Sequence, residues 1–409
     1  MLLYFLIIVP TLFASFLVFS YWQERKYRRK PYYKLADVGW RQNTLPPDSE
    51  KLYSLAMLGD IGAVATNGTD PVLNHFKLWQ SENRGAETAV FLGDNLYPVG
   101  LPPEGHRHRA MAETRLQTIL QQLQAYQTNS VFLSGNHDWN KGRPDGYQYM
   151  LRQEKYIVEA LENPAGYLPP HGCPGPVTLQ LAEGLLLVVI NTQWWVQRGE
   201  KPLGKNYNCP YTDIEEFYLS LNDLLRKNRH QRIVIAAHHP LYSNALHGGK
   251  FTIKQHVFPL TAAHKRFLIP LPLLGSLYPF YRRYFGAYED MSHKKYKRMR
   301  KRLLQIFHRY QNIVYIAGHD HNLQHFEKRG NHYMVSGSGS KTAFVKKGGS
   351  ATFTLEQPGF IVLNYYRSGE LWMEVHVVPA TPAEAATGTG EVIFRKKLES
   401  VLVPQQAPV

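Results

Sequence analysis

Six short apolar stretches of the chain each end in polar side chains that can bind a metal ion or move a proton. These side chains are Asp60, Asp94, Asn136 with His137 and Asp138, Asn191, His238 with His239, and His319 with Asp320 and His321. A phenol, Tyr97, follows Asp94 by three residues. A single aspartate after a strand is typical of a turn or a helix cap. Metal-capable groups at almost every one of these ends indicate a metal site instead.

The six stretches are rich in β-branched or aromatic residues, and each is broken by glycine, proline or a polar cluster. This pattern predicts strands that are buried on both faces. Residues 106–126 and 212–228 have apolar side chains at helical spacing, and the second range has Thr212 as a candidate cap. Strands that alternate with helices predict an α/β layer fold, in which ligand sites lie at the carboxyl ends of the strands.

The motifs GDIG, GDNLY, GNHD, AAHHP and GHDHN, in this order, resemble those of the calcineurin-like metallophosphoesterases over roughly residues 51–378. The resemblance implies a β-sandwich of two mixed sheets flanked by helices, with αββα layers. Most members begin with Asp-x-His, whereas here Gly62 stands at the histidine position. Purple acid phosphatases of the tartrate-resistant type share this departure and have a tyrosine three residues after the second-motif aspartate. Tyr97 occupies that position, so the chain is most similar to this branch.

The resemblance implies a site for two metal ions that share Asp94. The first ion would bind Asp60, Asp94, Tyr97 and His321, and the second would bind Asp94, Asn136, His238 and His319. A phenolate favours ferric iron, and imidazole with carboxamide suits a softer divalent ion. We therefore expect Fe(III) with Fe(II), Zn or Mn. Such a pair holds phosphoryl oxygens and lowers the pKa of a bound water, which predicts hydrolysis of phosphate esters by attack of a metal-activated water.

Three further residues have catalytic roles by the same resemblance. His137 would lie near the leaving group, and Asp138 would orient His137. His247 follows His238 by nine residues and precedes a glycine, as an active-site histidine does in the small acid phosphatases. It would contact the phosphate or donate a proton, because an imidazole can protonate a leaving oxygen near neutral pH.

Residues 1–22 contain no charged side chain and are long enough to cross a bilayer as one helix. We interpret them as an uncleaved single-pass anchor, followed by a basic linker over residues 23–50. The positive-inside rule then predicts a cytoplasmic catalytic domain, with a periplasmic or extracellular domain as the alternative. The two cysteines, Cys173 and Cys209, are compatible with two free thiols or with one disulfide in an oxidising compartment.

The chain has a formal net charge of +15, which favours anionic partners. Many of the basic residues lie within residues 248–302, an insert that is also rich in proline, leucine and aromatic residues. It is either a lid with a solvated basic helix or a patch that lies on anionic lipid. Basic residues next to apolar ones suit a phosphorylated small molecule or a lipid phosphate better than nucleic acid. Residues 379–409 are expected to form a tail that contains a linker and a short strand or a disordered end.

Two other functions remain open from the sequence. One is hydrolysis of a lipid-linked phosphate or pyrophosphate with a Mn-type centre, and the other is a non-catalytic membrane binding protein with a degenerate phosphatase domain. Donor groups at every motif favour an enzyme. The stretch SGSGSKT, residues 336–342, is not a P-loop, because Ser340 stands where that motif requires glycine. By resemblance it is the turn that borders the site.

Overall fold

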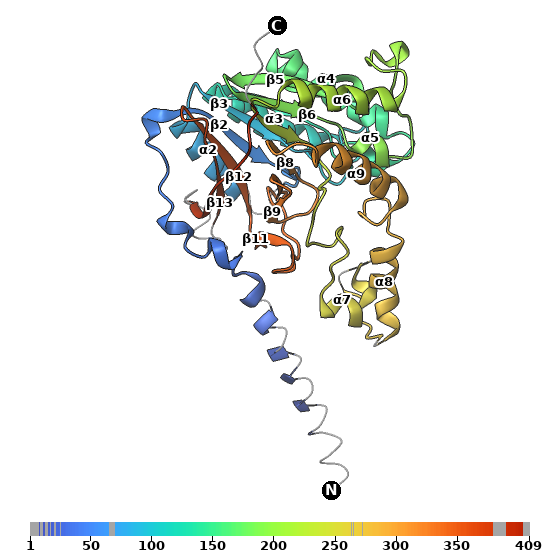
Figure 1. Cartoon of the computed structure of the whole chain (residues 1–409). Coiled ribbons are helices and arrows are strands. Elements are labelled where there is room, and N and C mark those ends of the chain that lie inside the picture. Colours follow the sequence, from blue (N-terminus) through green and yellow to red (C-terminus); the bar gives the residue numbers. More distant parts are fainter. Residues whose placement is uncertain are drawn as a thin grey trace.

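Two β-sheets packed face to face form the centre of the computed structural model (Figure 1). The structure describes residues 8, 11, 12, 15, 16, 18, 19, 22–24, 26–64, 70–262, 264, 266–271, 273–378 and 390–403. The eight-stranded sheet has the spatial order β1 (Tyr32–Tyr33), β11 (Ala351–Leu355), β9 (Leu323–Lys328), β10 (Asn331–Ser336), β8 (Ile313–Ala317), β7 (Arg232–Ala236), β6 (Leu185–Val189) and β5 (Val177–Ala182). The six-stranded sheet has the order β14 (Glu391–Lys397), β13 (Leu371–Val377), β12 (Gly359–Tyr366), β2 (Lys51–Leu58), β3 (Glu87–Phe91) and β4 (Asn129–Phe132).

Both sheets are mixed, and their parallel strands include those that end in the polar clusters. Strands β2, β3 and β4 are parallel neighbours in the six-stranded sheet. Strands β6, β7 and β8 are parallel neighbours in the other sheet. All six stretches predicted as strands are strands, and β3, β6, β7 and β8 are buried along their whole length. The prediction of strands buried on both faces is confirmed for these four strands, whereas β2 begins with three half-buried residues and β4 with an exposed one.

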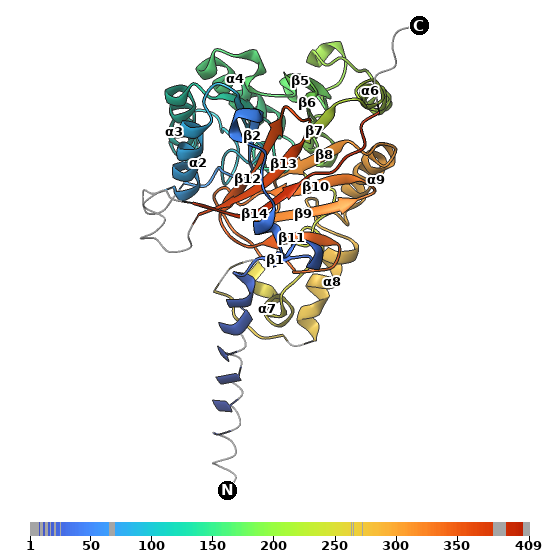
Figure 2. The same ribbon diagram turned by 60° about the vertical axis from the view of Figure 1, so that its left-hand side comes forward.

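Helices cover the outer face of each sheet, so the molecule has four layers (Figure 2). The six-stranded sheet is covered by α2 (Pro71–Glu82), α3 (Arg109–Tyr126) and α4 (Gly146–Leu161), and the eight-stranded sheet by α5 (Gln193–Val196), α6 (Ile214–Lys227) and α9 (Lys294–Phe307). Successive strand residues alternate between the layers. Met57 and Leu187 fill the space between the sheets, whereas Leu58 and Leu186 face the helices. This is the predicted αββα arrangement.

The predicted helix over residues 212–228 begins one residue later than its candidate cap implies. The side chain of Asp213, not Thr212, accepts the hydrogen bond from the backbone N–H of Glu215, at 2.7 Å. Thr212 instead donates its hydroxyl to Glu216. An aspartate is as good a cap as a threonine, and its charge also suits the positive end of the helix dipole.

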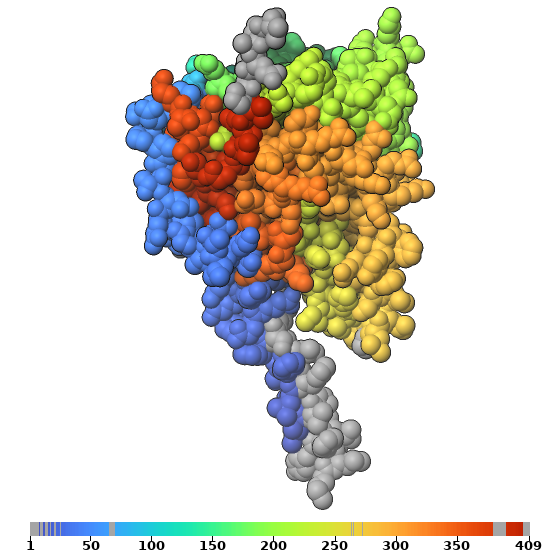
Figure 3. Space-filling view, viewed as in Figure 1, coloured from blue at the N-terminus to red at the C-terminus, as the bar shows by residue number. Residues whose placement is uncertain are grey.

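Residues 248–302 consist of two structurally different parts. The first contains α7 (Ile253–Val257) and α8 (Leu277–Tyr284), and it projects from the sandwich at the end from which the described N-terminal helical residues extend (Figures 1 and 3). The second part is the start of α9, which buries Tyr296 and Met299 against the eight-stranded sheet. The basic residues of α9 therefore lie on a helix whose other face belongs to the core.

The two terminal segments are described only in part. The anchor expected over residues 1–22 lies mostly outside the described residues. In the part of the chain that the structure describes, no helix has both the length and the apolar character needed to cross a bilayer. Of the tail expected over residues 379–409, only residues 390–403 are described, and they contain β14.

The cysteines form a disulfide, which decides between the two alternatives that the sequence allows. Cys173 and Cys209 are joined across 36 residues of sequence, with their Cα atoms 5.6 Å apart. The bond ties the loop before β5 to the segment that leads into α6. Both cysteines are buried, so the bond is shielded from solvent.

Candidate metal centre

The strand ends of both sheets meet at one edge of the sandwich. Asp60 follows β2, Asp94 follows β3 and Asn136 follows β4, all in the six-stranded sheet. His238 follows β7 and His319 follows β8 in the eight-stranded sheet. Because the carboxyl ends of parallel strands share one edge, these five side chains converge although they are far apart in sequence.

The first group of donors surrounds the hydroxyl of Tyr97. This oxygen lies 2.9 Å from Oδ1 of Asp60, 3.0 Å from Oδ2 of Asp94 and 3.1 Å from Nε2 of His321. A phenol has one proton and cannot satisfy two carboxylates and an imidazole at once. The two carboxylates are buried, and three anionic or basic donors aimed at one point fit a cation. The residues present therefore fit the first predicted metal.

The second group of donors surrounds the side-chain oxygen of Asn136. Its Oδ1 lies 2.9 Å from Nε2 of His238 and 3.0 Å from Nδ1 of His319, and the two nitrogens are 3.2 Å apart. Ligands about 2.0–2.2 Å from a common ion are separated by roughly 3 Å, so this spacing fits a second metal. The chemistry of the set, two imidazoles and a carboxamide, is that expected for a divalent ion.

Asp94 lies between the two groups and faces both. Its Oδ2 faces Tyr97, while its Oδ1 lies 3.5 Å from Nε2 of His238. Burial would raise the pKa of Asp94, but the charges of His137 and His238 lower it to about 2. Asp60 differs, since burial and then the charge of Asp94 raise its pKa well above the usual value. A bound cation would oppose that shift by favouring the ionised form.

Backbone groups hold the candidate ligands in place. Nδ1 of His238 lies 2.8 Å from the carbonyl oxygen of Leu92, and Nε2 of His319 lies 2.9 Å from that of Glu289. Donation of these N–H groups leaves the other ring nitrogens free to face Asn136. The N–H of His319 donates to Oδ2 of Asp60 at 2.7 Å, so one sheet also orients a ligand from the other.

Three of the candidate ligands have left-handed backbone conformations. The φ angles are 59° for Asp60, 54° for Asp94 and 71° for His319. Such conformations cost on the order of 1–3 kcal/mol each in a non-glycine residue and are concentrated at functional sites. The neighbouring Gly135 is required for space, because a Cβ there would lie 2.3 Å from Oδ1 of Asp94.

His137 lies beside the first group, and its ring is held by the backbone of Pro98. Nδ1 of His137 lies 2.7 Å from the carbonyl oxygen of Pro98, and its ring packs edge-on against Tyr97. Asp138 is fully buried and accepts hydrogen bonds from the backbone of Gly135, from both nitrogens of Asn95 and from Gln153. We expected Asp138 to orient His137, but these hydrogen bonds of Asp138 go to the loop that holds Asn136, to the segment after β3 and to α4.

His247 lies at the second group, with its ring 4.1 Å from that of His319. Its Nδ1 lies 3.0 Å from Oδ1 of Asp290. Burial would lower the pKa of His247, but the hydrogen bond to Asp290 and the charge of Asp320 raise it above the usual value. Asp290 also binds Arg282, and these partners lower the pKa of Asp290 to about 2.

Sequence reasoning missed Glu289 and Asp290, which both belong to the predicted insert. Oε1 of Glu289 accepts a hydrogen bond from Nδ2 of Asn136 at 2.9 Å. Neither residue is in a family motif. One sequence signal was available, since they are the only acidic residues in the range 248–302. Two adjacent carboxylates in an otherwise basic stretch indicate a specific partner for each.

The turn over residues 336–342 borders the site as expected. The N–H of Gly339 donates to the carbonyl of Gly59 at 3.0 Å, and Ser340 binds the carbonyl of Asp60. The turn also brings Nζ of Lys341 to 3.2 Å from the centroid of the Tyr97 ring. Lys341, a cation at the first group, was not identified from the sequence.

His239 and Asn191 have different surroundings from the ligand candidates. His239 groups with His238 and His319, yet its Nδ1 bonds to Thr192 at 2.9 Å. Asn191 donates to the carbonyl of Gly172 and so supports a loop.

A family model described as calcineurin-like phosphoesterase matches residues 53–323, which include every candidate metal ligand. The chain belongs to this family. Calcineurin-like phosphoesterases are metal-dependent, and the two donor groups provide the ligands for that chemistry. Gly62 and Tyr97 are the residues on which the expected resemblance to purple acid phosphatases rests.

Solved structures with a similar arrangement have low sequence identity to this calcineurin-like phosphoesterase. GAP50, titled the anchor in the inner membrane complex of Plasmodium, is 17% identical, with 85% of this chain and 89% of that chain covered and a TM-score of 0.48. The purple acid phosphatase PPD1 from yellow lupin seeds is 14% identical, with coverages of 84% and 53% and a TM-score of 0.46. PhoD is 11% identical, with coverages of 88% and 74% and a TM-score of 0.49. Comparison with the curated proteins finds no match.

Proposed function

We propose that the protein is a dinuclear metal phosphoesterase of the purple acid phosphatase type, which hydrolyses phosphate esters by attack of an activated water. The observation that carries this proposal is the position of Asp94. Its two oxygens face two separate groups of donors, one around Tyr97 and one around Asn136. A carboxylate between two cation sites is the arrangement that two-metal hydrolysis requires.

The roles of the remaining residues follow from their positions. Two bound cations would neutralise the phosphoryl oxygens and acidify the attacking water. His247, with its pKa raised, can hold a proton near neutral pH and deliver it to the leaving oxygen. Lys341 adds a positive charge beside the first donor group, which favours an anionic substrate.

Metal analysis and a substrate screen test the proposal. Purified protein loaded with iron and a divalent metal should bind two ions and show a visible tyrosinate-to-iron charge-transfer band. It should hydrolyse soluble phosphomonoesters, and Asn136→Ala should lose that activity, with Asn43→Ala as the matched control. A folded, metal-loaded protein that hydrolyses no phosphomonoester, phosphodiester or pyrophosphate would refute it and favour the non-catalytic alternative.

A second candidate is hydrolysis of a lipid-linked phosphate or pyrophosphate with a Mn-type centre. The observation that favours it is the continuity between the exposed apolar insert and the metal centre, since Asp290 follows α8 closely and binds His247. A centre that binds two Mn ions, shows no charge-transfer band and prefers lipid pyrophosphates in mixed micelles would support it. Equal rates on soluble esters and lipid phosphates would count against it.

We also propose that residues 1–22 anchor the protein to a membrane and that the catalytic domain faces an oxidising compartment. The disulfide between Cys173 and Cys209 supports this orientation, because such bonds persist outside the reducing cytoplasm. The basic residues after the apolar segment favour the opposite face. Protease digestion of cells stripped of their outer layers decides between the two, since a periplasmic or extracellular domain is then cleaved before the plasma membrane is permeabilised.

A further inference from the structure

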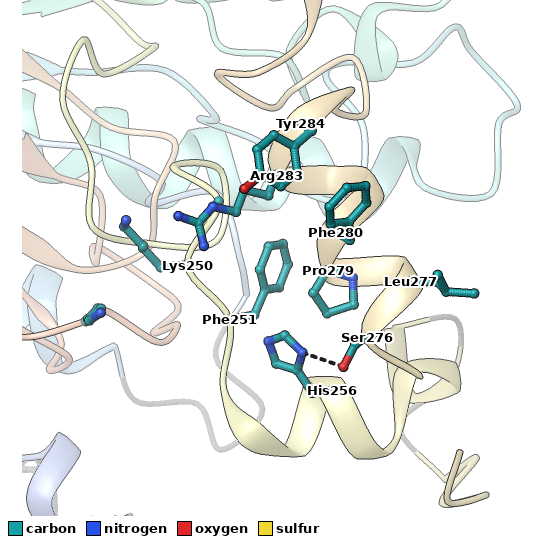
Figure 4. Close-up of a pocket in the computed structure, with 11 residues that line it drawn as sticks. Lys250, Phe251, His256, Ser276, Leu277, Pro279, Phe280, Arg283 and Tyr284 are labelled. Carbon is teal, nitrogen blue, oxygen red and sulfur yellow. Dashed lines mark hydrogen bonds between the residues drawn. The ribbon is translucent and has the colours of Figure 1, made fainter. Parts of the chain in front are cut away.

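The projecting part of the insert encloses a pocket that is separate from the metal centre. A cavity of about 420 Å³ lies between α7, α8 and the segment that leads into α7 (Figure 4). Its lining residues include Lys250, Phe251, Phe280, Arg283, Tyr284 and Lys346. A hydrogen bond of 3.0 Å between Nδ1 of His256 and Oγ of Ser276 closes the end nearest α7.

Three cations line this pocket without a carboxylate partner. Among the ion pairs of the described residues, none includes Lys250, Arg283 or Lys346. Burial lowers the pKa of Lys250, and the charges of Arg283 and Lys346 lower it further. The adjacent Arg282 differs, since it is paired with Asp290. Cations held together without an anion of the chain provide a site for an external anion.

The other walls of the pocket are apolar and continue into an exposed apolar surface. Phe251 and Pro279 lie below the charged end that Lys250 and Arg283 form, and Phe280 lies across the pocket from it (Figure 4). Phe280 is 56% exposed. Leu277 of the lining is also exposed, and the insert exposes further apolar side chains at Phe267, Leu268, Ile269, Leu273, Tyr281 and Phe285. A surface of this kind on a soluble domain marks a docking site, and a free phosphate ion would not use it.

The position of this surface indicates which partner it meets. It lies at the end of the molecule from which the described N-terminal helical residues extend, and that segment exposes Leu12, Phe16, Phe19 and Trp22 (Figures 2 and 3). The insert and the N-terminal segment thus expose apolar side chains on the same side of the molecule, and the pocket cations lie behind them. A membrane leaflet has the matching order, because its acyl chains lie beneath anionic headgroups.

We propose that the pocket between α7 and α8 binds the phosphate headgroup of an anionic lipid, while the exposed apolar side chains of the insert enter the acyl layer of the same leaflet. Lys250, Arg283 and Lys346 contact the phosphate, and Phe251 and Phe280 contact the first part of the lipid chains. This site goes beyond the proposed reaction and does not depend on it, because none of its residues belongs to the metal centre.

Titration of the full chain in a nonionic detergent with short-chain lipids tests this proposal. Dioctanoyl phosphatidic acid should bind in calorimetry and dioctanoyl phosphatidylcholine should not. Inorganic phosphate should bind at least roughly ten-fold more weakly, since it lacks the apolar contacts. Asn136→Ala, which should not hydrolyse this phosphomonoester, should still bind phosphatidic acid, so the binding that remains there belongs to the pocket and not to the metal centre. Equal affinities for phosphate and phosphatidic acid would overturn the proposal.

Matched variants locate the binding. The double variant Lys250→Glu/Lys346→Glu should lose phosphatidic acid binding, and Phe280→Ser should weaken it without changing the weaker binding of phosphate. The control Lys297→Glu/Lys301→Glu reverses the same number of charges on α9 and should bind as the wild type does. Near-ultraviolet circular dichroism checks that each variant is folded. Retained binding in the pocket variant, or an equal loss in the control, would refute the proposed site.

Discussion

At the scale of single residues, the centre depends on one carboxylate and one phenol. Asp94 is the residue whose oxygens face both donor groups, and the Tyr97 hydroxyl lies in the first group, where the proposed function gives it the place of the histidine missing at Gly62. Both side chains are buried, so neither tolerates the loss of its partners without an electrostatic cost. Single substitutions at the centre should therefore have large effects on metal binding and activity.

Removal of the Tyr97 hydroxyl should weaken binding of the first metal and leave binding of the second metal intact. In Tyr97→Phe we expect the visible charge-transfer band to disappear and the iron held by the first group to be lost, because that group loses its hard anionic donor. The second group keeps all of its donors. Elemental analysis and absorption spectroscopy measure this, with Tyr156→Phe as the control. An unchanged band in Tyr97→Phe would show that Tyr97 is not a ligand.

The proton on His247 should determine the alkaline limb of the pH–rate profile. The pKa of His247 is raised, so an acid role is lost as the pH increases through a value above the usual 6.5. Asp290→Asn removes the partner that favours the charged form, so the limb should move to lower pH by about one unit. The dependence of kcat on pH measures the shift, and Asp223→Asn serves as the surface control. A limb that does not move would exclude this role.

The same shift makes a linked contribution to stability. Because the pKa of His247 is higher in the folded protein than in the unfolded chain, its charged imidazole stabilises the fold at pH values below the unfolded-state pKa. This contribution is lost as the pH rises through the folded-state pKa.

Gly135 should not accept a side chain. The Cβ of Gly135→Ala would lie 2.3 Å from Oδ1 of Asp94, so we expect Asp94 to be displaced and metal binding to weaken by about ten-fold or more. Gly39→Ala is the control, because the nearest atom to a Cβ there is 3.8 Å away. Calorimetric metal titration compares the two. Equal affinities in both variants would show that the loop can move aside without affecting the centre.

At the scale of elements, the site is built from loops that leave buried strands, and other links keep those loops in place. Asp138 accepts a hydrogen bond from the backbone N–H of Gly135 in the loop after β4. Glu289, in the segment after α8, binds Asn136 through its side chain and His319 through its carbonyl oxygen. The disulfide between Cys173 and Cys209 restrains a third segment. Rigid strands with cross-linked loops maintain the distances that metal ligands require.

Reduction of the disulfide should destabilise the fold. The bond closes a loop with a sequence separation of 36 residues, for which the chain-entropy model gives about 4 kcal/mol. Urea unfolding with and without a reductant should show a loss of this order. The variant Cys173→Ser/Cys209→Ser should be less stable by the same amount and insensitive to reductant. Wild-type stability that does not change on reduction would show that the bond does not form in solution.

At the scale of the whole molecule, the centre connects the two sheets. Asp60, Asp94 and Asn136 come from one sheet, and His238 and His319 come from the other. Metal bound to the folded state alone stabilises it in proportion to the logarithm of the free metal concentration. The metals should therefore act as a link between the halves of the sandwich, in addition to their role in chemistry.

Removal of metal should lower the thermal stability of the whole domain. A chelator should reduce Tm by several degrees, for which about 2–4 °C per kcal/mol is expected in a large domain, and added metal should restore it. Asp94→Asn should have a reduced Tm that the chelator does not change. Differential scanning calorimetry measures both. If the chelator lowers the Tm of both proteins equally, the effect does not come from this centre.

Local patterns were sufficient to predict the parts of this protein that depend on neighbouring residues in sequence. The six strands and the polar groups at their ends follow from motifs a few residues long, because burial and turn chemistry are local. The αββα layers, the glycine–serine turn and the two donor groups were expected from the resemblance to the calcineurin-like metallophosphoesterases. The cap of α6 was misplaced by one residue because aspartate and threonine are equivalent caps by sequence.

Only the tertiary structure decided which residues from distant segments became partners. Cys173 is bonded to Cys209, and Glu289 accepts a hydrogen bond from Asn136. Asp290 is the partner of His247, and Asp138 accepts a hydrogen bond from the backbone of Gly135. The tertiary structure also divided residues 248–302 into a projecting pocket and a core helix. These pairings depend on the geometry of the packed sheets and loops, which brings groups together regardless of their separation in sequence. A linear pattern identifies a donor, but packing determines what it faces.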